Sequence, residues 1–248
     1  MGYLNARVTR DERVRRNRLR LRYEVHPGER YHVRNLDVDI QDSALQHQLA
    51  EANALPRLSE GMKFDLNVLD EERGRISSVL ANRGYYRFNK DFIRFEADTT
   101  VGHHQVDLLM KVLPYNITPA RDTILHNRYR IREVTYQVDT TRTGRPFLRQ
   151  RALREASRLE PGNIYREQDV QETYARMIRL GGVLGTNVRL YPAPSDSTGL
   201  DAVVQVSQGK HNSFGVEVEG TNSAGDFGAA LSASYQNRNV FRGGETFG

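Results

Sequence analysis

Strict alternation of apolar and polar residues recurs at three places along the chain. Its apolar positions run from Leu19 to Val25, from Val106 to Val112 and from Leu200 to Val206. Alternation with a period of two predicts a strand that buries one face and exposes the other. Each stretch then ends at residues that interrupt strands, which are Pro27 and Gly28, Pro114, and Gly209.

A second strand is predicted ahead of each of these three, over residues 6–10, 92–96 and 187–191. The connections that follow these strands are polar, which favours antiparallel hairpins. Two further alternating stretches, residues 214–218 and 227–235, lie near the C-terminus with no helical pattern beside them. Every second residue of such strands faces outward in the wall of a transmembrane β-barrel, and the pattern is typical of that wall.

Helical periodicity occupies the sequence ahead of the middle hairpin. The pattern predicts a first helix over residues 44–53, with Ser43 as its N-cap. It predicts a longer second helix that begins after Asp65 or Asn67 and stops at Gly84. Both helices therefore lie between an opening strand and the closing hairpin.

The same order returns in the second half of the chain. The residues RYHVRNL at positions 30–36 reappear as RYRIREV at positions 128–134, and self-similarity on this scale indicates tandem domains. Two helices are predicted after the second copy, over residues 147–157 and 166–180, the latter with an apolar stripe of Val170, Tyr174 and Met177. Each complete unit reads strand, helix, helix, strand, strand. This order predicts an α+β fold in which two helices cover a three-stranded sheet.

The spacing inside the two copies differs by one helical turn. Phe64 precedes Gly84 by 20 positions, whereas Tyr165 precedes Gly181 by 16. Because one turn takes about 3.6 residues, the shorter copy still buries the same face of its second helix. Both aromatic residues are expected to anchor the core, each after a turn at Gly61 or Gly162.

These patterns divide the chain into five segments. Residues 1–26 match only the end of a unit and lack an apolar signal core, so we interpret them as the closing hairpin of a truncated unit. The other predicted segments are a complete unit over residues 27–113, a connector over 114–127, a second unit over 128–208 and the start of a β-barrel over 209–248.

The composition is that of a globular chain, with 38% hydrophobic and 27% charged residues and a mean hydropathy of −0.65. The net charge of +5 is concentrated in eight arginines between Arg7 and Arg22. A basic face attracts anionic lipid headgroups or nucleic acid. Alternation with Leu19 and Leu21 favours instead a solvated strand face. The absence of cysteine excludes disulfides and thiolate metal sites.

Two segments after the second unit carry a family signature. They are SFGVEVEG at residues 213–220 and YQNRNVFRGGE at residues 235–245. Tandem units followed by these segments resemble the POTRA domains and opening barrel strands of the BamA/TamA superfamily of outer-membrane assembly proteins. The more specific part is the Asn-x-Phe-Arg-Gly-Gly element, with Asn239, Phe241, Arg242 and Gly243. The connector departs from the enterobacterial pattern, and the general pattern is similar to TamA-like proteins of Bacteroidetes.

The resemblance implies a periplasmic arm attached to a barrel in the bacterial outer membrane. The implied partners are unfolded outer-membrane protein clients and periplasmic or inner-membrane assembly partners, and neither a cofactor nor catalysis is implied. The open edge of a small sheet exposes unpaired N–H and C=O groups, to which an extended client can add as another strand. Such backbone bonds are indifferent to the client's sequence.

The client-binding edges are predicted to be the strands that follow the second helix of each unit. Their residues are Phe92, Ile93, Arg94 and Phe95 in the first unit and Val188, Arg189 and Leu190 in the second. A proline at Arg94 or Arg189 is expected to weaken client binding where it removes an exposed N–H. Tyr31 and Tyr129 are expected to pack at domain junctions.

No motif for catalysis or phosphate binding accompanies these units. His103 and His104 are adjacent but lack a third ligand at a suitable spacing, which favours an exposed loop over a metal site. The carboxylates of Asp70, Glu71 and Glu72 are expected to be solvated and to pair with arginines on the same helix.

The alternative function is that of a basic, KH-like module that binds RNA, because that class shares the order of strand, helix, helix and strand. Such a module requires a Gly-x-x-Gly clamp between helices, or aromatic residues exposed on one face of the sheet. Residues 60–63 supply only one glycine, and Phe92 and Phe95 need not share a face. We therefore expect no nucleic-acid partner.

Overall fold

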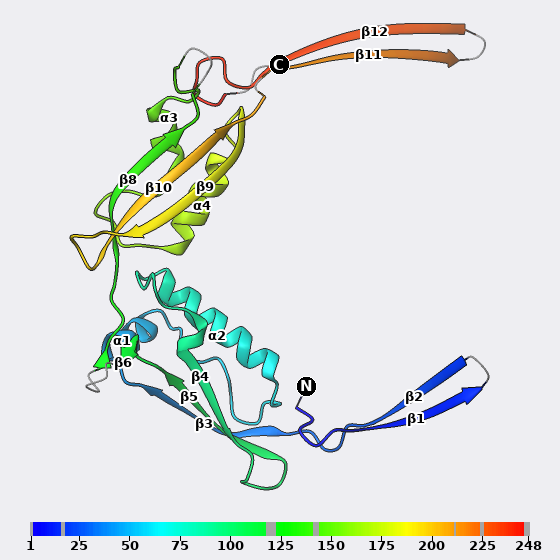
Figure 1. Cartoon of the computed structure of the whole chain (residues 1–248), viewed down its shortest axis with the longest axis vertical. Coiled ribbons are helices and arrows are strands. Elements are labelled where there is room, and N and C mark those ends of the chain that lie inside the picture. Colours follow the sequence, from blue (N-terminus) through cyan, green and yellow to red (C-terminus); the bar gives the residue numbers. More distant parts are fainter. Residues whose placement is uncertain are drawn as a thin grey trace. The chain divides into compact units, whose positions relative to one another are not determined.

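The computed structural model describes residues 2–15, 18–117, 123–140, 144–210, 212–223 and 226–245. The chain forms two compact units, Met1–Asn127 and Arg128–Gly248 (Figure 1). In its described residues, each unit contains a three-stranded sheet, two α-helices and a long terminal hairpin.

The sheet of the first unit has the strand order β3-β5-β4. The central strand β5 pairs parallel with β3 and antiparallel with β4. The elements are β3 (His32–Ile40), α1 (Ser43–Glu51), α2 (Leu66–Ala81), the short 3-10 helix η1 (Lys90–Phe92), β4 (Ile93–Asp98) and β5 (Gln105–Val112). This order confirms the predicted succession of strand, helix, helix, strand and strand.

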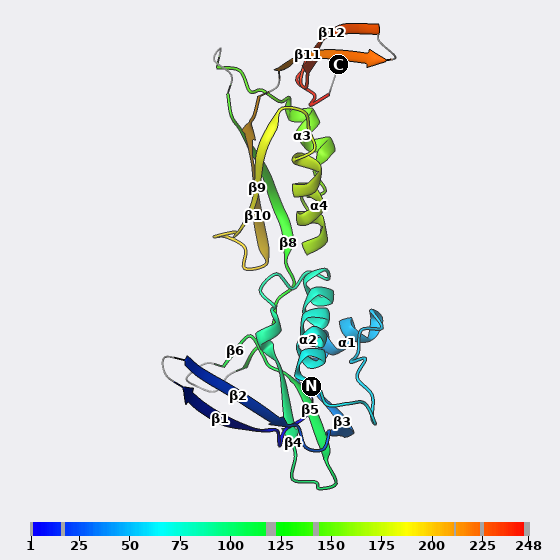
Figure 2. The same ribbon diagram turned by 90° about the vertical axis from the view of Figure 1, so that its right-hand side faces the viewer.

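Both helices of the first unit cover one face of its sheet, as Figure 2 shows. Every second side chain of β5 points beneath them, so Val106, Leu108 and Met110 are buried. The fully buried residues that the helices contribute are Leu45, Leu49, Ile76 and Leu80. Burial of each such side chain is worth about 1.5–3 kcal/mol, and this core therefore holds the helices on the sheet.

The residue that caps α1 differs from the predicted one. Asp42, not Ser43, is the N-cap, because its carboxylate accepts hydrogen bonds from the N–H groups of Ala44 and Leu45 at 2.9 and 3.2 Å. Ser43 already lies inside the helix. Asp65 caps α2 as predicted, and its carboxylate accepts the N–H two residues farther on at 3.0 Å. Side-chain caps of this kind satisfy N–H groups that the helix itself leaves open.

The second unit repeats this architecture with the strand order β8-β10-β9. Its elements are β8 (Arg130–Val138), α3 (Gln150–Ala156), α4 (Glu167–Met177), β9 (Val183–Pro192) and β10 (Gly199–Gln208). Helix α3 begins three residues later than predicted, since Phe147 and Leu148 form a bend ahead of the helix and are buried there. Helix α4 is five residues shorter than α2, in agreement with the missing turn.

The buried stripe of α4 differs from the prediction. Tyr174 is 47% exposed, whereas its neighbour Thr173 is fully buried. The Thr173 hydroxyl donates to the Asp169 carbonyl at 2.7 Å and accepts the Arg158 N–H at 2.9 Å, so the buried polar group is satisfied. The apolar pattern could not reveal this, because the residue at the centre of the buried face is polar.

Glu72 is buried in α2 and accepts a backbone N–H in the same way. The expectation that it is solvated is wrong, because only 6% of the residue is exposed. Its carboxylate accepts the Arg57 N–H at 2.8 Å, as Thr173 accepts that of Arg158 in the other unit. Glu71 is exposed, as predicted.

The predicted turns and aromatic anchors are present in both units. The Gly61 N–H donates to the Val33 carbonyl at 2.8 Å, and the Gly162 N–H donates to the Ile131 carbonyl at 2.7 Å. Both glycines have positive φ, +79° and +91°, which favours glycine over other residues. The aromatic residues that follow are buried, with 4% of Phe64 and 6% of Tyr165 exposed.

A two-stranded hairpin lies at each end of the chain. The strands are β1 (Arg7–Arg15) and β2 (Arg18–His26) at the N-terminal end and β11 (Asn212–Ser223) and β12 (Asp226–Asn237) at the C-terminal end. The predicted burial of one face of β2 is wrong in this structure, since Leu19 and Tyr23 are 60% and 59% exposed. In the part of the chain that the structure describes, no helix packs on that face.

The connector between the units contains the short strands β6 (Asn116–Ile117) and β7 (Thr123–Ile124), and residues 118–122 lie outside the described part. His126 fastens the connector to the first unit. It is 8% exposed, and its Nε2 lies 3.0 Å from the Leu113 carbonyl oxygen. Its ring centroid lies 4.5 Å from that of Phe92 and 4.9 Å from that of Phe88. The boundary between the two units follows His126 by one residue.

Acid should loosen this attachment. Burial lowers the pKa of His126 below its ordinary value of 6.5, although the Leu113 carbonyl and the Asp42 carboxylate act in the opposite direction. The stability that the neutral ring contributes is therefore complete above pH 6.5 and is lost as the pH falls from 6.5 toward the folded-state pKa. We expect amide exchange over residues 123–127, corrected for intrinsic rate, to accelerate between about pH 7.5 and about pH 5.5.

The control for this prediction is His126→Gln, whose amide can still donate to the Leu113 carbonyl but does not titrate in this range. Exchange over the connector should then respond much less to pH. An equal response in the two proteins would assign the effect to another group.

Candidate functional site

Strand β4 lies at an edge of the first sheet, and its pairing with β5 decides which backbone groups face outward. The Leu113 N–H donates to the Phe92 carbonyl at 2.8 Å, and hydrogen-bonded pairs alternate from there along an antiparallel ladder. The residues that turn their N–H and C=O groups toward β5 are thus Arg94 and Glu96. The residues that turn theirs outward are Ile93, Phe95 and Ala97.

Only part of this outward edge is open. The Ile93 N–H donates to the Lys90 carbonyl, and the Ile93 carbonyl accepts Nε of Arg73 at 2.8 Å. The same Arg73 nitrogen lies 3.1 Å from the Lys90 carbonyl oxygen. Arg73 therefore closes the beginning of the edge, and Phe95 and Ala97 form the open part of β4. Of the predicted edge residues, Phe92 lies in η1 and not in the strand.

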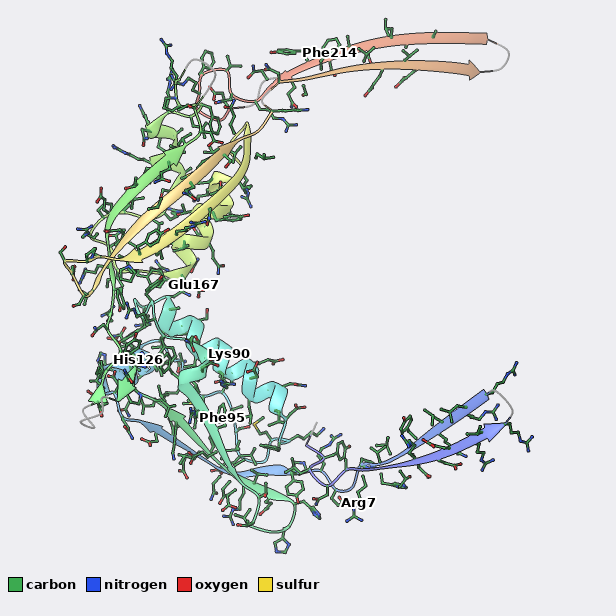
Figure 3. All side chains as sticks on the ribbon, in the orientation of Figure 1. Arg7, Lys90, Phe95, His126, Glu167 and Phe214 are labelled. Carbon is green, nitrogen blue, oxygen red and sulfur yellow. The ribbon has the colours of Figure 1, made fainter. Side chains whose placement is uncertain are left out.

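A groove of about 630 Å³ runs between β4 and α2, beside the open edge. Its lining residues are Phe64, Leu66, Leu69, Asp70, Arg73, Ile93, Arg94, Phe95, Glu96 and Ala97. Leu66 is 67% exposed, and Phe95 packs partly against both parts of the core. The side chains of an added strand that point toward the helices would enter this groove, because side chains alternate between the two faces. Figure 3 labels Phe95 and Lys90 near this part of the unit.

Ion pairs border the groove. Asp70 accepts from Nζ of Lys90 at 3.0 Å and from Arg73 at 3.1 Å. The hydrogen bond from Lys90 lowers the pKa of Asp70, and the charges of Lys90 and Arg73 lower it further, while partial burial opposes them. The Asp70 carboxylate is therefore ionised near neutral pH, and its pair with Arg73 holds that side chain in place over the edge.

Strand β9, the corresponding edge of the second sheet, pairs antiparallel with β10. The Ala193 N–H donates to the Gly199 carbonyl at 2.9 Å, and the alternation from this pair turns the Arg189 backbone toward β10. The backbones of Val188 and Leu190 have the opposite orientation. Arg94 and Arg189 are consequently the wrong positions for a proline, because their N–H groups belong to the sheet.

The pattern of residues did not reveal a further edge, that of β8. Loop residues close its beginning, since the Ile131 N–H donates to the Asn163 carbonyl at 2.8 Å. At its other end the Asp139 N–H donates to the Val206 carbonyl at 3.2 Å. Alternation between these points turns the backbones of Val134, Tyr136 and Val138 outward.

A second groove, of about 430 Å³, adjoins the β8 edge. Its lining residues are Val134, Tyr136, Arg154, Leu159, Glu160 and Pro161. Strand β8, the first of the unit, lies at an edge of the sheet because β10, the last strand, pairs between β8 and β9. Strand order is a tertiary property, and periodicity carries no signal for it.

The two predicted junction tyrosines differ in their surroundings. The Tyr31 N–H donates to the Gly2 carbonyl at 2.8 Å, and its hydroxyl accepts from Asn5 at 3.1 Å. Tyr31 thus joins the chain that leads into β1 to the first sheet. Tyr129 is 4% exposed, and its carbonyl accepts the Tyr165 N–H at 2.9 Å inside the second unit. Its role at a junction stays a prediction.

The predicted barrel motif is bound to the second unit. We call residues 238–245 the cap segment. The Asn239 amide donates to the Phe147 carbonyl at 2.7 Å. Backbone bonds then join the Arg149 N–H to the Arg242 carbonyl at 2.9 Å and the Gly181 N–H to the carbonyl of the second glycine at 2.7 Å. Within the cap, the Phe241 and Gly243 N–H groups donate to Glu245 at 2.8 Å each. Nothing in the sequence pattern indicated this contact.

The structure gives no evidence of other site chemistry in its described residues. His103 and His104 lie in the turn between β4 and β5, where both have positive φ. Within the described ranges, no three histidine, aspartate or glutamate side chains are arranged to hold a metal ion. No helix in the same ranges is long and apolar enough to span a membrane.

Solved structures with similar folds contain POTRA domains. The structure of BamA from Haemophilus ducreyi lacking POTRA domains 1–3 matches with a TM-score of 0.62 and 18% identity, over 84% of this chain and 35% of that one. The crystal structure of POTRA domains 3–5 of Haemophilus influenzae BamA matches with a TM-score of 0.51 and 18% identity, over 84% of this chain and 74% of that one.

These likenesses establish the fold. The two complete units have the α+β fold of BamA POTRA domains, as predicted. The chain spans about a third of the length of the Haemophilus ducreyi protein that it matches. No protein-family model and no curated protein matches the chain. The finer resemblance to TamA-like proteins of Bacteroidetes has no support among these matches.

Proposed function

We propose that this chain is the periplasmic POTRA region of an outer-membrane protein that assembles or translocates other proteins. In this proposal it binds unfolded client polypeptides by strand addition and passes them to a membrane barrel, without catalysis and without a cofactor. The observation that carries the proposal is the open edge at Phe95 and Ala97 beside the groove between β4 and α2. The POTRA fold shared with BamA supports it.

The geometry favours weak and transient binding. Phe95 and Ala97 together offer two N–H donors and two C=O acceptors to an added strand. A backbone hydrogen bond contributes about 0.5–1.5 kcal/mol net, and ordering an unfolded client offsets part of that gain. Arg73 limits the length of the added strand, since it occupies the Ile93 carbonyl. Weak binding that is independent of sequence suits a protein that must release many clients.

The remaining segments have proposed places in the same assembly. Strands β11 and β12 pair so that Phe214 lies opposite Tyr235 and Val218 opposite Leu231, which gathers apolar residues on one face. These side chains are 59–75% exposed, and a lipid-facing surface would accommodate them. We propose that residues 209–248 begin an outer-membrane barrel and that residues 1–26 close a further POTRA unit. Periplasmic or inner-membrane assembly proteins are the proposed partners besides the clients.

The test uses Ala97, an exposed residue whose N–H faces outward. Ala97→Pro removes that donor, and we expect binding of an extended, alternating client peptide to weaken about fivefold to tenfold, as the loss of one or more hydrogen bonds implies. Ala97→Val is the matched control, since valine keeps the N–H and favours strands. Fluorescence anisotropy with a labelled peptide measures both affinities.

Client peptides with N-methylated backbones supply an independent readout. Methylation of every second residue blocks one edge of the peptide, and the alternate pattern blocks the other. Strand addition predicts that one of these two peptides loses affinity and the other keeps it. Equal affinities for both peptides, or for the Ala97→Pro and Ala97→Val proteins, would refute strand addition at β4.

A further inference from the structure

The cap segment gathers cationic residues at one end of the second unit. It contacts the unit at Phe147, Arg149 and Gly181, and the Gly209 N–H donates nearby to the Gly182 carbonyl at 2.7 Å. Two carboxylates lie among these contacts: that of Glu245 in the cap segment, and that of Asp139, which accepts the Gln208 N–H at 2.9 Å. We call the cationic residues that lie within two positions of these contacts, or of the cap residues that make them, the basic collar: Arg145, Arg149, Arg151, Arg179, Lys210, Arg238 and Arg242.

Most charges of the collar are available to a ligand. The Glu245 carboxylate is held inside the cap by the N–H groups of Phe241 and Gly243. Arg151 pairs with Glu155 at 2.7 Å, and Arg238 donates to the Gln236 amide oxygen at 3.1 Å. The collar residues that are exposed and form no ion pair within the described ranges are Arg145, Arg149, Arg179, Lys210 and Arg238.

Charge and apolar exposure distinguish this end from the other end of the unit. Helix α4 runs from an acidic end of the unit toward the collar. It begins with Glu167 and Asp169, and its last residue lies four positions before Gly181, which binds the cap segment. Figure 3 labels Glu167 at one end of the unit and Phe214 at the other. Next to the collar, Phe214, Val240 and Phe241 are 73%, 47% and 60% exposed. Arginines mixed with exposed aromatic residues are typical of the interfacial zone of a membrane.

We infer that the basic collar binds the anionic headgroups of a phospholipid membrane surface. The inference rests on the proposed membrane location of β11 and β12, whose base adjoins the cap segment in sequence. Each cation near an anionic surface strengthens binding about fivefold. Headgroup binding at the collar would hold this POTRA unit close to the membrane while its sheet edges stay open to clients. The exposed aliphatic residues Val218, Leu231 and Val240 favour a membrane over RNA, because they offer no ring on which a base could stack.

Vesicle flotation of the full chain tests the inference. The vesicles contain phosphatidylcholine alone or with about 30% phosphatidylglycerol, at low and at high salt. We expect binding to the anionic vesicles that weakens with salt. The combined substitution Arg145→Gln, Arg149→Gln and Arg179→Gln should reduce the partition coefficient about 100-fold.

The matched control is Arg18→Gln, Arg20→Gln and Arg22→Gln on β2, which removes the same charge from the other basic surface and should leave the partition coefficient nearly unchanged. An equal loss in this control, an unchanged collar variant, or displacement of the vesicles by equimolar single-stranded RNA would overturn the inference. Peptide binding at β4, measured on the same proteins, reports separately on the proposed client function.

Discussion

Replacing Glu72 with alanine should destabilise the first unit by about 3–5 kcal/mol, the range for the loss of one partner of a buried ion pair. The Glu72 carboxylate accepts two hydrogen bonds from Arg75, at 2.7 and 2.9 Å, and one from the Arg57 N–H. Arg75 also donates to the carbonyls of Ala54 and Leu55 at 3.0 Å each. Alanine would leave a largely buried guanidinium without its counter-charge and the Arg57 N–H without its acceptor.

The loss in the free energy of unfolding can be measured by urea unfolding. Hydrogen exchange, read in peptides of the first unit, monitors that unit separately from the second. Glu71→Ala is the control, because Glu71 precedes Glu72 on the same helix and is exposed. A substitution at such a surface position should change stability by less than about 0.5 kcal/mol. Similar losses in the two variants would contradict the structural role of the Glu72 carboxylate.

The stability that Glu72 contributes to the first unit also depends on pH in a defined direction. Burial acts to raise the pKa of Glu72, but the hydrogen bonds from Arg75 and Arg57 and their charges outweigh it, so the pKa is lowered from 4.5. Stability from this group is therefore present above pH 4.5 and is lost as the pH falls through the folded-state pKa. Thr173 at the corresponding contact in the second unit carries no charge and adds no such dependence.

Replacing Gly181 with alanine should release the cap segment. A Cβ at this position would lie 2.0 Å from the Arg238 carbonyl oxygen and 2.7 Å from that of Gly244. Both atoms belong to the backbone, so no side chain can move aside. We expect the amide of residue 181 to exchange at least about tenfold faster, since its bond to Gly244 and the adjoining bond from Arg149 are worth roughly 1 kcal/mol each. Nuclear magnetic resonance detects the individual amides.

Gly185→Ala on β9 is the matched control. A Cβ there meets nothing within 4 Å, so this variant should keep the cap bound. Retained protection in Gly181→Ala would mean that the cap shifts without detaching. If the cap is released, its two arginines leave the basic collar, and binding to anionic vesicles should weaken as well.

Sequence periodicity predicted the elements of the fold because each element repeats its own signal. The alternation of Val106, Leu108 and Met110 placed β5, and these side chains are buried. Gly61 and Gly162 predicted turns, and both have the positive φ that favours glycine. The prediction failed where a polar residue occupies the centre of a buried face. Glu72 and Thr173 are satisfied there by backbone N–H groups that lie 15 residues away along the chain.

For the candidate client-binding edges, too, the sequence predicted the strands but not the contacts between distant residues. The sequence indicated the strands that follow the second helices, and β4 and β9 lie at the edges of their sheets. It could not indicate that Arg73 closes the beginning of β4, because that contact spans 20 residues. Nor could it indicate that Phe95 and Ala97, rather than Arg94, face outward, since a single pair with Leu113 sets that alternation.

By itself, the sequence determined the repeat, the order of the elements and the buried face of β5, because these properties depend on neighbours within a few turns or strand residues. Only the tertiary structure decided the strand order, the open backbone groups of each edge, the bond from the Arg57 N–H to Glu72 and the attachment of the cap segment to Phe147 and Gly181. These properties depend on hydrogen bonds and close contacts between distant segments, and such contacts leave no periodic trace along the chain.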